Sequence, residues 1–273
     1  MTTAALTPRL PALFVSHGSP MFALEPGETG PALGAFGAAL RTRVRGVVIM
    51  SPHWMSREPA VMTHPRPATW HDFGGFPQAL YQLQYPAPGD PGLAQRVMDL
   101  LAQAQITAQA DPQRPLDHGA WVPLMHLFPQ ADVPVVQVAL PARWAARDVF
   151  AMGQALAPLR DEGVLVIGSG SMTHNLAEFF GGERDAAPYV VEFSRWIESA
   201  IATHSLQPLL AWDREAPHAR RAHPTDEHFL PLFFALGAGG LTDDPQGARA
   251  DYLSREVMHG MLAMDSFSIG ASA

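Results

Sequence analysis

The 273-residue chain contains no cysteine, which excludes disulfides, thiolate metal sites and a cysteine nucleophile. It is also poor in basic residues, since 18 Lys and Arg stand against 26 Asp and Glu, for a formal net charge of -8. Nucleic-acid binding needs clustered Lys and Arg, so this dispersed set argues against such a partner. No apolar run is long enough to span a bilayer, and residues 1–10 lack the features of a secretory signal. We therefore expect a cytoplasmic protein that does not act at a membrane.

Hydrophobic residues make up 47% of the chain and fall into two alternating kinds of segment. Short β-branched runs are typical of buried parallel strands, and they occur at 13–15, 47–50, 133–140 and 164–167, with a late strand expected at 261–267. Stripes of helical period lie between them, at 31–43, 93–101 (after the N-cap candidate Asp90), 149–159 and 188–201. The alternation predicts an α/β fold with a central, largely parallel sheet flanked by helices. With no repeat, low-complexity segment or linker, we expect one catalytic domain over residues 1–273, structured from about 11 to 269 between short flexible termini.

Three histidines lie just after predicted strands, namely His17, His53 and His174. In open α/β sheets the ligand crevice lies outside the carboxyl ends of the strands, so we expect these side chains to converge there. A fourth, His228, would reach the crevice from the start of a helix capped by Thr225. Neutral imidazole suits zinc, copper, iron and nickel. The pattern therefore predicts a metal site at the carboxyl ends of the strands.

Several neighbouring residues have both a functional and a structural interpretation. Trp54 would either wall the site or fill the core beside His53, and the pair Asp117-His118 would either support the site or form a surface turn. The aromatic, glycine-rich loop at 71–77 is interpreted as a lid or ring-stacking wall, with a purely structural loop as the alternative. The Gly-Ser-Gly-Ser stretch before His174 resembles a phosphate cradle, but no P-loop lysine, G-x-G-x-x-G or G-x-S-x-G follows.

An ordered series of motifs over about residues 11–269 resembles the class III (LigB-type) extradiol ring-cleaving dioxygenases, and most closely their dihydroxyphenylalanine (DOPA) dioxygenase branch. The motifs that carry the resemblance are His17-Gly18-Ser19-Pro20, Ser51-Pro52-His53-Trp54, His71-Asp72-Phe73-Gly74-Gly75-Phe76-Pro77, Tyr85-Pro86-Ala87-Pro88-Gly89, Asp117-His118-Gly119, Thr173-His174-Asn175-Leu176 and Glu227-His228-Phe229-Leu230-Pro231-Leu232. Any one of these motifs is weak, but their shared order along one chain is specific.

The resemblance implies a role for each of these sites. His17, His53 and His228 would bind the metal, and His174 would act as acid and base in catalysis and as a fourth ligand of the resting site. His118 would be the second catalytic residue, by orienting the substrate. Together with the loop interpretation, the resemblance gives a substrate-binding set of His71, Asp72, Phe73 and Trp54. Non-haem Fe(II) is the implied cofactor, with Zn(II) as an alternative bound metal, because His228 replaces the carboxylate ligand of the broader class.

The function implied is the opening of a small catechol, DOPA-like or protocatechuate-like, with O2 outside its two hydroxyl groups. Two other functions fit the same histidines. One is a zinc-dependent hydrolase that activates water, and the other is a non-enzymatic metal-binding interaction protein on the same scaffold. Oxygen consumption separates the first function from both alternatives, since neither hydrolysis nor binding uses O2.

Overall fold

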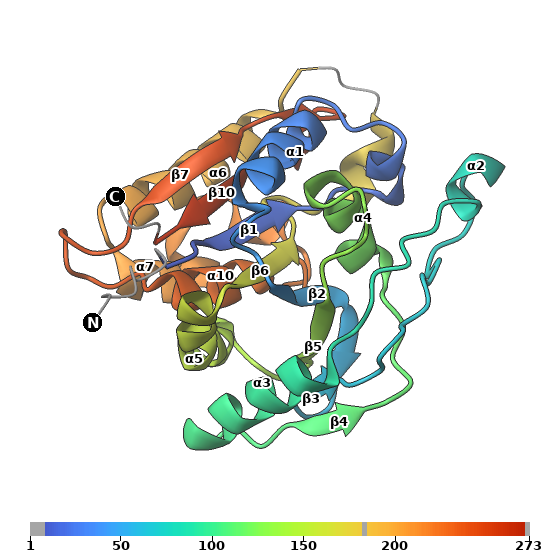
Figure 1. The fold of residues 1–273 in the computed structure, drawn as a ribbon. Helices are drawn as coiled ribbons and strands as arrows, with labels where there is room; N and C mark the ends of the chain where they lie inside the picture. The colour runs from blue at the N-terminus through green and yellow to red at the C-terminus, as the bar shows by residue number, and fades with distance from the viewer. Residues whose placement is uncertain (1–8, 182–184, 271–273) are drawn as a thin grey trace.

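Eight strands form one continuous sheet through the centre of the protein (Figure 1). The computed structural model describes residues 9–181 and 185–270, so the predicted flexible termini lie outside the described residues. The sheet order is β4-β3-β5-β2-β6-β1-β10-β7. The strands are β1 (Ala12–Ser16), β2 (Gly46–Ser56), β3 (Ala60–Met62), β4 (Gln109–Asp111), β5 (Val135–Pro141), β6 (Val164–Gly170), β7 (Ala250–Ser254) and β10 (Ser266–Ile269), while β8 (Val257–Met258) and β9 (Leu262–Ala263) form a separate pair.

The four central strands, β5, β2, β6 and β1, run parallel to one another. The outer strands are mixed: β3 pairs antiparallel with β5, and β10 pairs antiparallel with both β1 and β7. The prediction of a largely parallel sheet is confirmed. The late strand expected at 261–267 is wrong in its extent, because β9 pairs with β8 and only the chain from Ser266 enters the main sheet.

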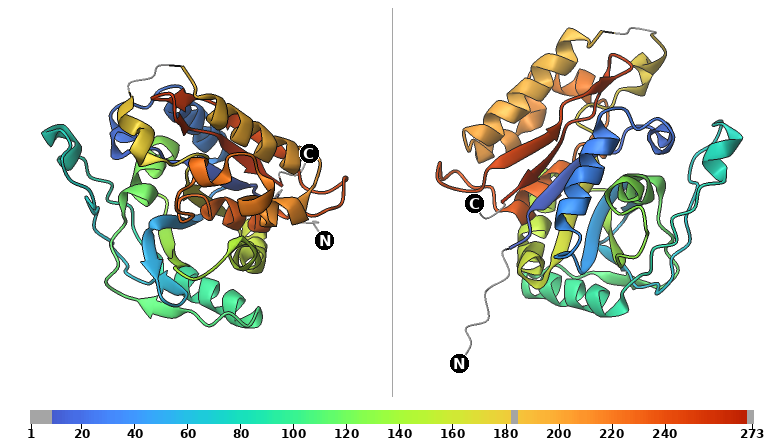
Figure 2. Two further views of the ribbon diagram at one scale, coloured as in Figure 1. Left: turned by 180° about the vertical axis from the view of Figure 1, so that it is seen from behind. Right: turned by 45° about the horizontal axis from the view of Figure 1, so that its top comes forward.

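Helices cover both faces of this sheet (Figures 1 and 2). Helices α1 and α4 pack together on one face, and α5 and α10 pack together on the other. The helices are η1 (Pro20–Ala23), α1 (Thr29–Leu40), α2 (Gln78–Tyr81), α3 (Pro91–Gln103), α4 (His118–Leu127), α5 (Ala146–Leu156), η2 (Ala157–Glu162), η3 (Leu176–Gly181), α6 (Pro188–Ala202), α7 (Leu206–Leu210), α8 (Trp212–Glu215), α9 (Ala219–Ala222) and α10 (Pro231–Gly239). No helix in the described ranges is long and apolar enough to cross a membrane.

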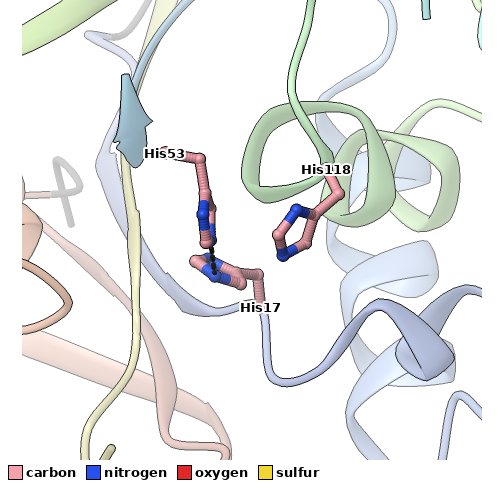
Figure 3. A group of neighbouring side chains, drawn as sticks. All are labelled: His17, His53 and His118. Atoms are coloured by element: carbon pink, nitrogen blue, oxygen red, sulfur yellow. Dashed lines mark hydrogen bonds between the residues drawn. The ribbon is translucent and has the colours of Figure 1, made fainter. Parts of the chain in front are cut away.

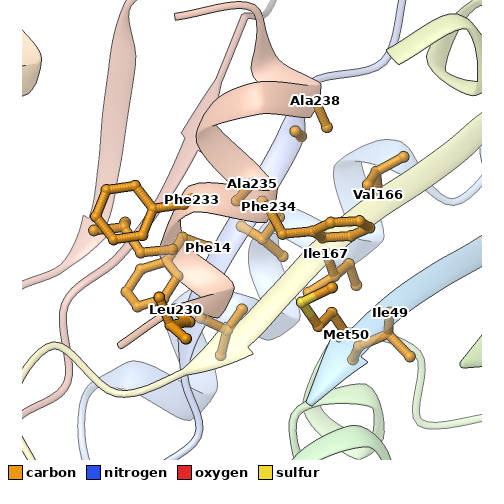
Figure 4. Close-up of a cluster of buried hydrophobic side chains, with 14 of the residues drawn as sticks. Phe14, Ile49, Met50, Val166, Ile167, Leu230, Phe233, Phe234, Ala235 and Ala238 are labelled. Atoms are coloured by element: carbon orange, nitrogen blue, oxygen red, sulfur yellow. The ribbon is translucent and has the colours of Figure 1, made fainter. Parts of the chain in front are cut away.

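Helix α10 forms the centre of the main core (Figure 4). It is buried on every side because it packs against β1 and β6 as well as α5, which explains why its sequence is apolar all round. Phe233 and Phe234 lie against residues of the neighbouring strands, such as Phe14 and Ile167. The α5–α10 contact is close, since a Cβ at Gly237 would come within 2.1 Å of the Phe150 carbonyl oxygen. This core fixes the position of the chain that leads into α10.

Two predicted helix starts have different outcomes. The Asp90 carboxylate accepts a hydrogen bond from the Leu93 amide at 2.9 Å, so the predicted N-cap of α3 is confirmed. The helix start predicted at Thr225 is wrong, because α10 begins at Pro231 and the Thr225 hydroxyl donates to the Glu227 carboxylate. Proline at the first helical position costs no hydrogen bond, whereas inside a helix it would remove one. His228 therefore lies in the turn before the helix.

Candidate functional site

Five histidines from five separate segments meet at the carboxyl ends of the central strands. They are His17 directly after β1, His53 near the end of β2, His118 at the first position of α4, His174 after β6 and His228 before α10. The expected convergence of the strand-end histidines is observed. His53 differs in one respect, because it lies within β2, where the pairing with β5 is irregular between Met50 and Met55, rather than after the strand. This irregularity separates His53 from the regular ladder of the sheet.

His17, His53 and His118 form one group of possible ligands (Figure 3). Their ligand nitrogens lie within 4.8 Å of one another, and the Nε2 atoms of His17 and His53 are 3.2 Å apart. Nitrogens that bind one ion at about 2.0–2.1 Å are roughly 3 Å apart, so this pair already has the spacing of two ligands. His17 is 1% exposed. The group is thus an imidazole cluster, buried at His17 and His118 and half-buried at His53, that fits a transition metal.

The ring-nitrogen protonation of three histidines is fixed by their partners. The Ser169 hydroxyl donates to the Gly119 carbonyl and therefore accepts from His17 Nδ1, at 3.0 Å. His118 Nδ1 donates to Asp72 Oδ1 at 3.0 Å, and His228 Nδ1 donates to Glu227 Oε1 at 2.9 Å. In each ring the proton on Nδ1 leaves Nε2 unprotonated, which is the arrangement found around metal-binding histidines.

His174, Glu227 and His228 form a second group of possible ligands. The rings of His174 and His228 are stacked, with centres 3.6 Å apart and planes 8° from parallel. His228 also joins the first group, because its ring centre lies 5.0 Å from that of His53 and 5.7 Å from that of His17. The two groups are therefore parts of one site.

Ring spacing divides the five histidines into two kinds. Imidazoles bound to one ion through nitrogens at about 2.0–2.1 Å have ring centres roughly 5 Å apart at a tetrahedral angle. The centres of His17 and His53 are 5.2 Å apart, and those of His53 and His228 are 5.0 Å apart. His118 lies only 3.9 Å from the His53 ring, and His174 lies 3.6 Å from the His228 ring. His17, His53 and His228 thus have the spacing of co-ligands. His118 has that spacing to His17, at 5.6 Å, but lies in contact with His53, and His174 lies in contact with His228.

Burial lowers the pKa of four of these imidazoles and keeps them neutral. It lowers the pKa of His53 to about 4 and that of His228 to about 3, and it lowers the pKa of His17 well below its usual value. The pKa of His174 is also lowered, mainly by burial. The hydrogen bond from His228 lowers the pKa of Glu227 to about 2, so this carboxylate is ionised behind the ring. Neutral rings with free lone pairs are the form that binds metal.

Asp72 supports two of the histidines at once. Besides its contact with His118 Nδ1, its Oδ1 accepts from the His118 backbone amide at 2.9 Å, and its Oδ2 lies 3.8 Å from His53 Nδ1. Burial raises the pKa of Asp72, but the hydrogen bonds from His118 outweigh this and lower it below its usual value. Asp72 was expected to bind substrate; the structure places it behind the rings, where it positions them.

Arg114 joins the strand that carries His53 to the helix that carries His118. One guanidinium nitrogen donates to the His53 carbonyl oxygen at 3.1 Å and to Asp117 Oδ2 at 2.7 Å. Asp117 in turn caps α4, accepting from the Ala120 amide at 3.2 Å. The ring of Trp54 lies 4.9 Å from the Arg114 guanidinium carbon, and Trp54 is not among the residues that line the cavity described below. Trp54 therefore supports this network from behind the site.

Gly119 allows α4 to begin against the histidines. A Cβ at this position would lie 2.3 Å from the Ser51 hydroxyl oxygen, 2.9 Å from His53 Cδ2 and 3.2 Å from His17 Cε1. Any side chain here would push the two rings away. The glycine of Asp117-His118-Gly119 is thus required by close approach, and not by backbone conformation.

A cavity of about 360 Å³ opens beside the histidines. Phe73 and Phe76 form part of its wall, and the Phe73 ring meets the His118 ring edge-on at 5.6 Å. The expectation that the loop at 71–77 forms an aromatic wall agrees with this placement. His71 lies behind the wall, where Nε2 donates to the Leu83 carbonyl at 3.0 Å and the ring packs against Trp121. It anchors the loop and does not line the cavity.

Comparison with known proteins defines the class of the protein. Residues 11–263 match the family model described as the catalytic LigB subunit of aromatic ring-opening dioxygenase. The chain is 37% identical over 260 residues to a 4,5-DOPA dioxygenase extradiol from Beta vulgaris, covering 93% of this chain and 94% of the relative. It is 39% identical over 235 residues to a protein of the same name from Escherichia coli (strain K12), covering 84% and 85%. A solved structure of an uncharacterized Escherichia coli K12 protein superposes with a TM-score of 0.79 at 33% identity, covering 96% of this chain and all of the other.

The fold and the sequence matches are thus those of an aromatic ring-opening dioxygenase. The chain belongs to the LigB family of class III extradiol dioxygenases, and among its relatives it resembles the DOPA dioxygenases.

Three contributors to the site were not predicted from the sequence. Ser169 holds His17, Arg114 ties β2 to α4, and Leu262 lines the cavity from β9. Ser169 belongs to the Gly-Ser-Gly-Ser stretch, which resembles a phosphate cradle but lacks the accompanying motifs. No sequence pattern marked Arg114 or Leu262, because they reach the site through the tertiary fold alone.

Proposed function

We propose that the protein opens the ring of a small catechol with O2 at a non-haem Fe(II) held by Nε2 of His17, His53 and His228. The observation that carries the proposal is the set of three neutral rings, two buried and that of His53 half-buried, spaced 5.0–5.7 Å apart. Two of the three have Nδ1 engaged by Ser169 or Glu227, which leaves Nε2 as the ligand atom. A site with three protein ligands leaves positions open for a substrate and O2.

The metal and the neighbouring residues would share the chemistry. Bound Fe(II) supplies the redox activity that a reaction with O2 needs, and zinc lacks it. A ring nitrogen of His174, kept neutral by burial, accepts a proton from a catechol hydroxyl and returns it later in the reaction. Such acid–base catalysis typically contributes about 10²- to 10⁴-fold in rate. His174 and His228 line the same cavity, so a catechol bound there is within reach of the His174 ring.

His118 orients the substrate in this proposal. Asp72 holds the proton on its Nδ1, so its Nε2 accepts a hydrogen bond from a substrate hydroxyl. Phe73 and Phe76, whose rings meet edge-on at 5.4 Å, close the cavity on the side of the catechol ring and exclude water from it. His71 and Trp54 contribute from behind, the first by anchoring the aromatic loop and the second by packing on Arg114.

Family membership favours ring opening over the zinc hydrolase and the interaction protein. The test is to strip the metal, reconstitute the protein anaerobically with Fe(II) or Zn(II), and follow oxygen uptake with a panel of catechols. We expect one O2 consumed per catechol and a yellow ring-opened product with iron, and neither with zinc. Tight iron binding without oxygen uptake on any catechol would contradict the proposal.

A further inference from the structure

His223 is a buried histidine that the proposed function does not use. It lies directly after α9 and is 3% exposed, and its Nε2 donates to the Met172 carbonyl oxygen at 2.9 Å. A carbonyl oxygen can only accept, so the proton of this ring is on Nε2. Its Nδ1 has no hydrogen-bond partner in the described ranges. The ring therefore makes a single polar contact in the interior, and that contact is with the loop that carries His174.

The surroundings of the His223 ring would suit an apolar side chain. The rings of Phe193, Trp212 and Phe229 surround it, with centres 5.5, 5.7 and 4.7 Å away. Burial lowers the pKa of His223 to about 3, so the ring is neutral. A buried acceptor without a partner lowers stability, and a leucine or phenylalanine would fill the same space without that loss. Packing alone therefore does not explain a histidine here, whereas the bond from Nε2 does.

The loop at 171–175 has no regular secondary structure, so contacts with other segments must hold it in place. Two of these contacts fix its beginning. The Ser171 amide donates to the His228 carbonyl oxygen at 2.8 Å, and the Met172 amide donates to the Ser16 hydroxyl oxygen at 3.0 Å. Both partners lie at or next to a proposed metal ligand. The beginning of the loop is thus tied directly to the metal site.

The last residues of α9 fix the other half of the loop. The His174 amide donates to the Ala222 carbonyl oxygen at 2.8 Å, and the Asn175 side-chain amide donates to the Arg221 carbonyl oxygen at 2.8 Å. The His223 side chain adds the third contact, at the carbonyl two residues before His174. Three consecutive residues therefore hold the loop from both sides of the proposed acid–base residue.

We propose that His223 is a positioning residue for His174: its Nε2–H bond to the Met172 carbonyl holds the His174 ring against the ring of His228. The inference rests on the proposed function and names a residue that acts through His174. The two rings are stacked, with centres 3.6 Å apart and planes 8° from parallel. Because the chain runs from His223 directly on to His228, one short segment sets both rings. Proton transfer depends on such placement, since a displacement of about 1 Å can cost about 100-fold in rate.

A matched pair of substitutions separates the hydrogen bond from packing. His223→Gln places an amide N–H near the position of Nε2, whereas His223→Leu fills the aromatic surroundings without a donor. In the Fe(II)-loaded protein we expect His223→Leu to lower kcat for oxygen uptake about 10- to 100-fold, with KM changed less than about twofold and one iron per chain retained. His223→Gln should recover kcat to within about fivefold of the unmodified protein, because its donor is retained. Unchanged kcat in His223→Leu, or equal losses in both variants, would overturn the inference.

Thermal unfolding distinguishes this role from a structural one. His223→Leu removes the unpaired Nδ1 together with the donor, so we expect its Tm to stay within about 3 °C of the unmodified protein. The control is His204, which is 5% exposed, also has an unpartnered Nδ1, and lines a different cavity, between α6 and β7. Asparagine tolerates its φ of 56°, so His204→Asn should fold and keep the full kcat. A loss of kcat that followed Tm across these three variants would make His223 structural and overturn the inference.

Crystal structures of the zinc-loaded variants test the inference independently of turnover. We expect the His174 ring to move by about 1 Å or more from its stacked position in His223→Leu, and to keep that position in His223→Gln. If the iron form consumed no oxygen with any catechol, the proposed function would fail, while these structures would still decide whether His223 places the His174 ring. Unchanged stacking in His223→Leu would overturn the inference even if kcat had fallen.

Discussion

The two ends of the parallel strands bury polar side chains in opposite ways. At the amino ends lies Arg160, 2% exposed, whose guanidinium donates to the carbonyl oxygens of Leu10, Ala238 and Gly270. At the carboxyl ends lie His17 and four further histidines. In His17, His118 and His228 a hydrogen-bond partner holds the proton on Nδ1 and leaves Nε2 unprotonated. Burial lowers the pKa of Arg160 to about 10, so it stays protonated at neutral pH, whereas the buried histidines are neutral.

This difference separates a structural group from a functional one. Each guanidinium nitrogen of Arg160 donates to a backbone carbonyl oxygen. One carbonyl lies before β1, one near the end of α10 and one just after β10, so Arg160 joins three elements. His17, His118 and His228, in contrast, each keep an unprotonated Nε2 atom that can bind a metal. A buried polar group that is fully satisfied holds a fold together, while a cluster with unused lone pairs is available to a ligand.

The largest expected effect follows from removing a ligand. His53→Ala should abolish stoichiometric binding of Fe(II) and with it all oxygen uptake, because one of three ligand nitrogens is lost. Metal content after anaerobic reconstitution measures this. His218→Ala is the matched control, since His218 pairs with Glu192 on the surface, and it should bind metal normally. Full metal occupancy in His53→Ala would remove His53 from the ligand set.

Removing the proposed acid–base residue should leave the metal in place. His174→Gln is expected to lower kcat by about 10²- to 10⁴-fold while iron content stays at one ion per chain. The pH profile should lose the limb that reports the imidazole, which a purely structural change would not remove. Loss of iron together with activity would instead identify His174 as a ligand, as the resemblance also allows.

Arg160→Met tests the other end of the sheet. It leaves three backbone carbonyls without their donor, and we expect a loss of about 3–5 kcal/mol in the free energy of unfolding. Urea denaturation measures the loss, and metal stoichiometry of the folded protein should not change. Arg96→Met, which breaks a surface pair with Glu162, should alter stability little. A change in metal affinity for Arg160→Met would contradict the separation of the two ends.

Asp72→Asn tests whether a carboxylate behind the rings tunes the site. The amide still occupies the position but removes the charge that favours the Nδ1 proton of His118. We expect a loss of about 10- to 100-fold in metal affinity or kcat, as found for groups that support metal ligands. Because Asp72 Oδ2 also lies 3.8 Å from Nδ1 of His53, metal affinity should fall together with kcat, and a variant in which neither changes would contradict the supporting role of Asp72.

The smallest expected effect concerns Asp265, a buried carboxyl beside the end of β1. Burial raises its pKa to about 7, so the folded state retains a proton that the unfolded state releases. Stability should therefore fall by about 1–2 kcal/mol between roughly pH 5 and pH 7. Asp265→Asn should lose this slope, as measured by thermal unfolding across that range, and an identical slope in both proteins would contradict the assignment.

Much of this arrangement followed from the sequence. The β-branched runs gave the central strands, and the position of His17 after such a run was enough to place it at the sheet edge. The outer antiparallel strands did not follow, because Ala250–Ser254 of β7 is not a β-branched run and β10 pairs with β1 through contacts distant in sequence. The start of α10 was also misplaced, since the capping signal at Thr225 was outweighed by Pro231.

The site was predicted only in part, because the sequence pattern specifies the positions of some of its residues and not of others. Histidines at strand ends have a position that sequence pattern specifies, whereas His118 reaches them only because α4 begins against β2 at Gly119. Likewise, Trp54 and His71 follow the sequence motifs but face a supporting network and not the cavity. Which side of a strand or loop a side chain faces depends on bulges and loop packing that local pattern does not encode.

The most direct test is iron-edge anomalous diffraction from crystals of the Fe(II)-loaded protein grown without oxygen. We predict a single ion bound by Nε2 of His17, His53 and His228, with His118 and His174 beside it and open positions toward the cavity. An ion held by His118 in place of His228, or located away from these five histidines, would contradict the assignment of the site.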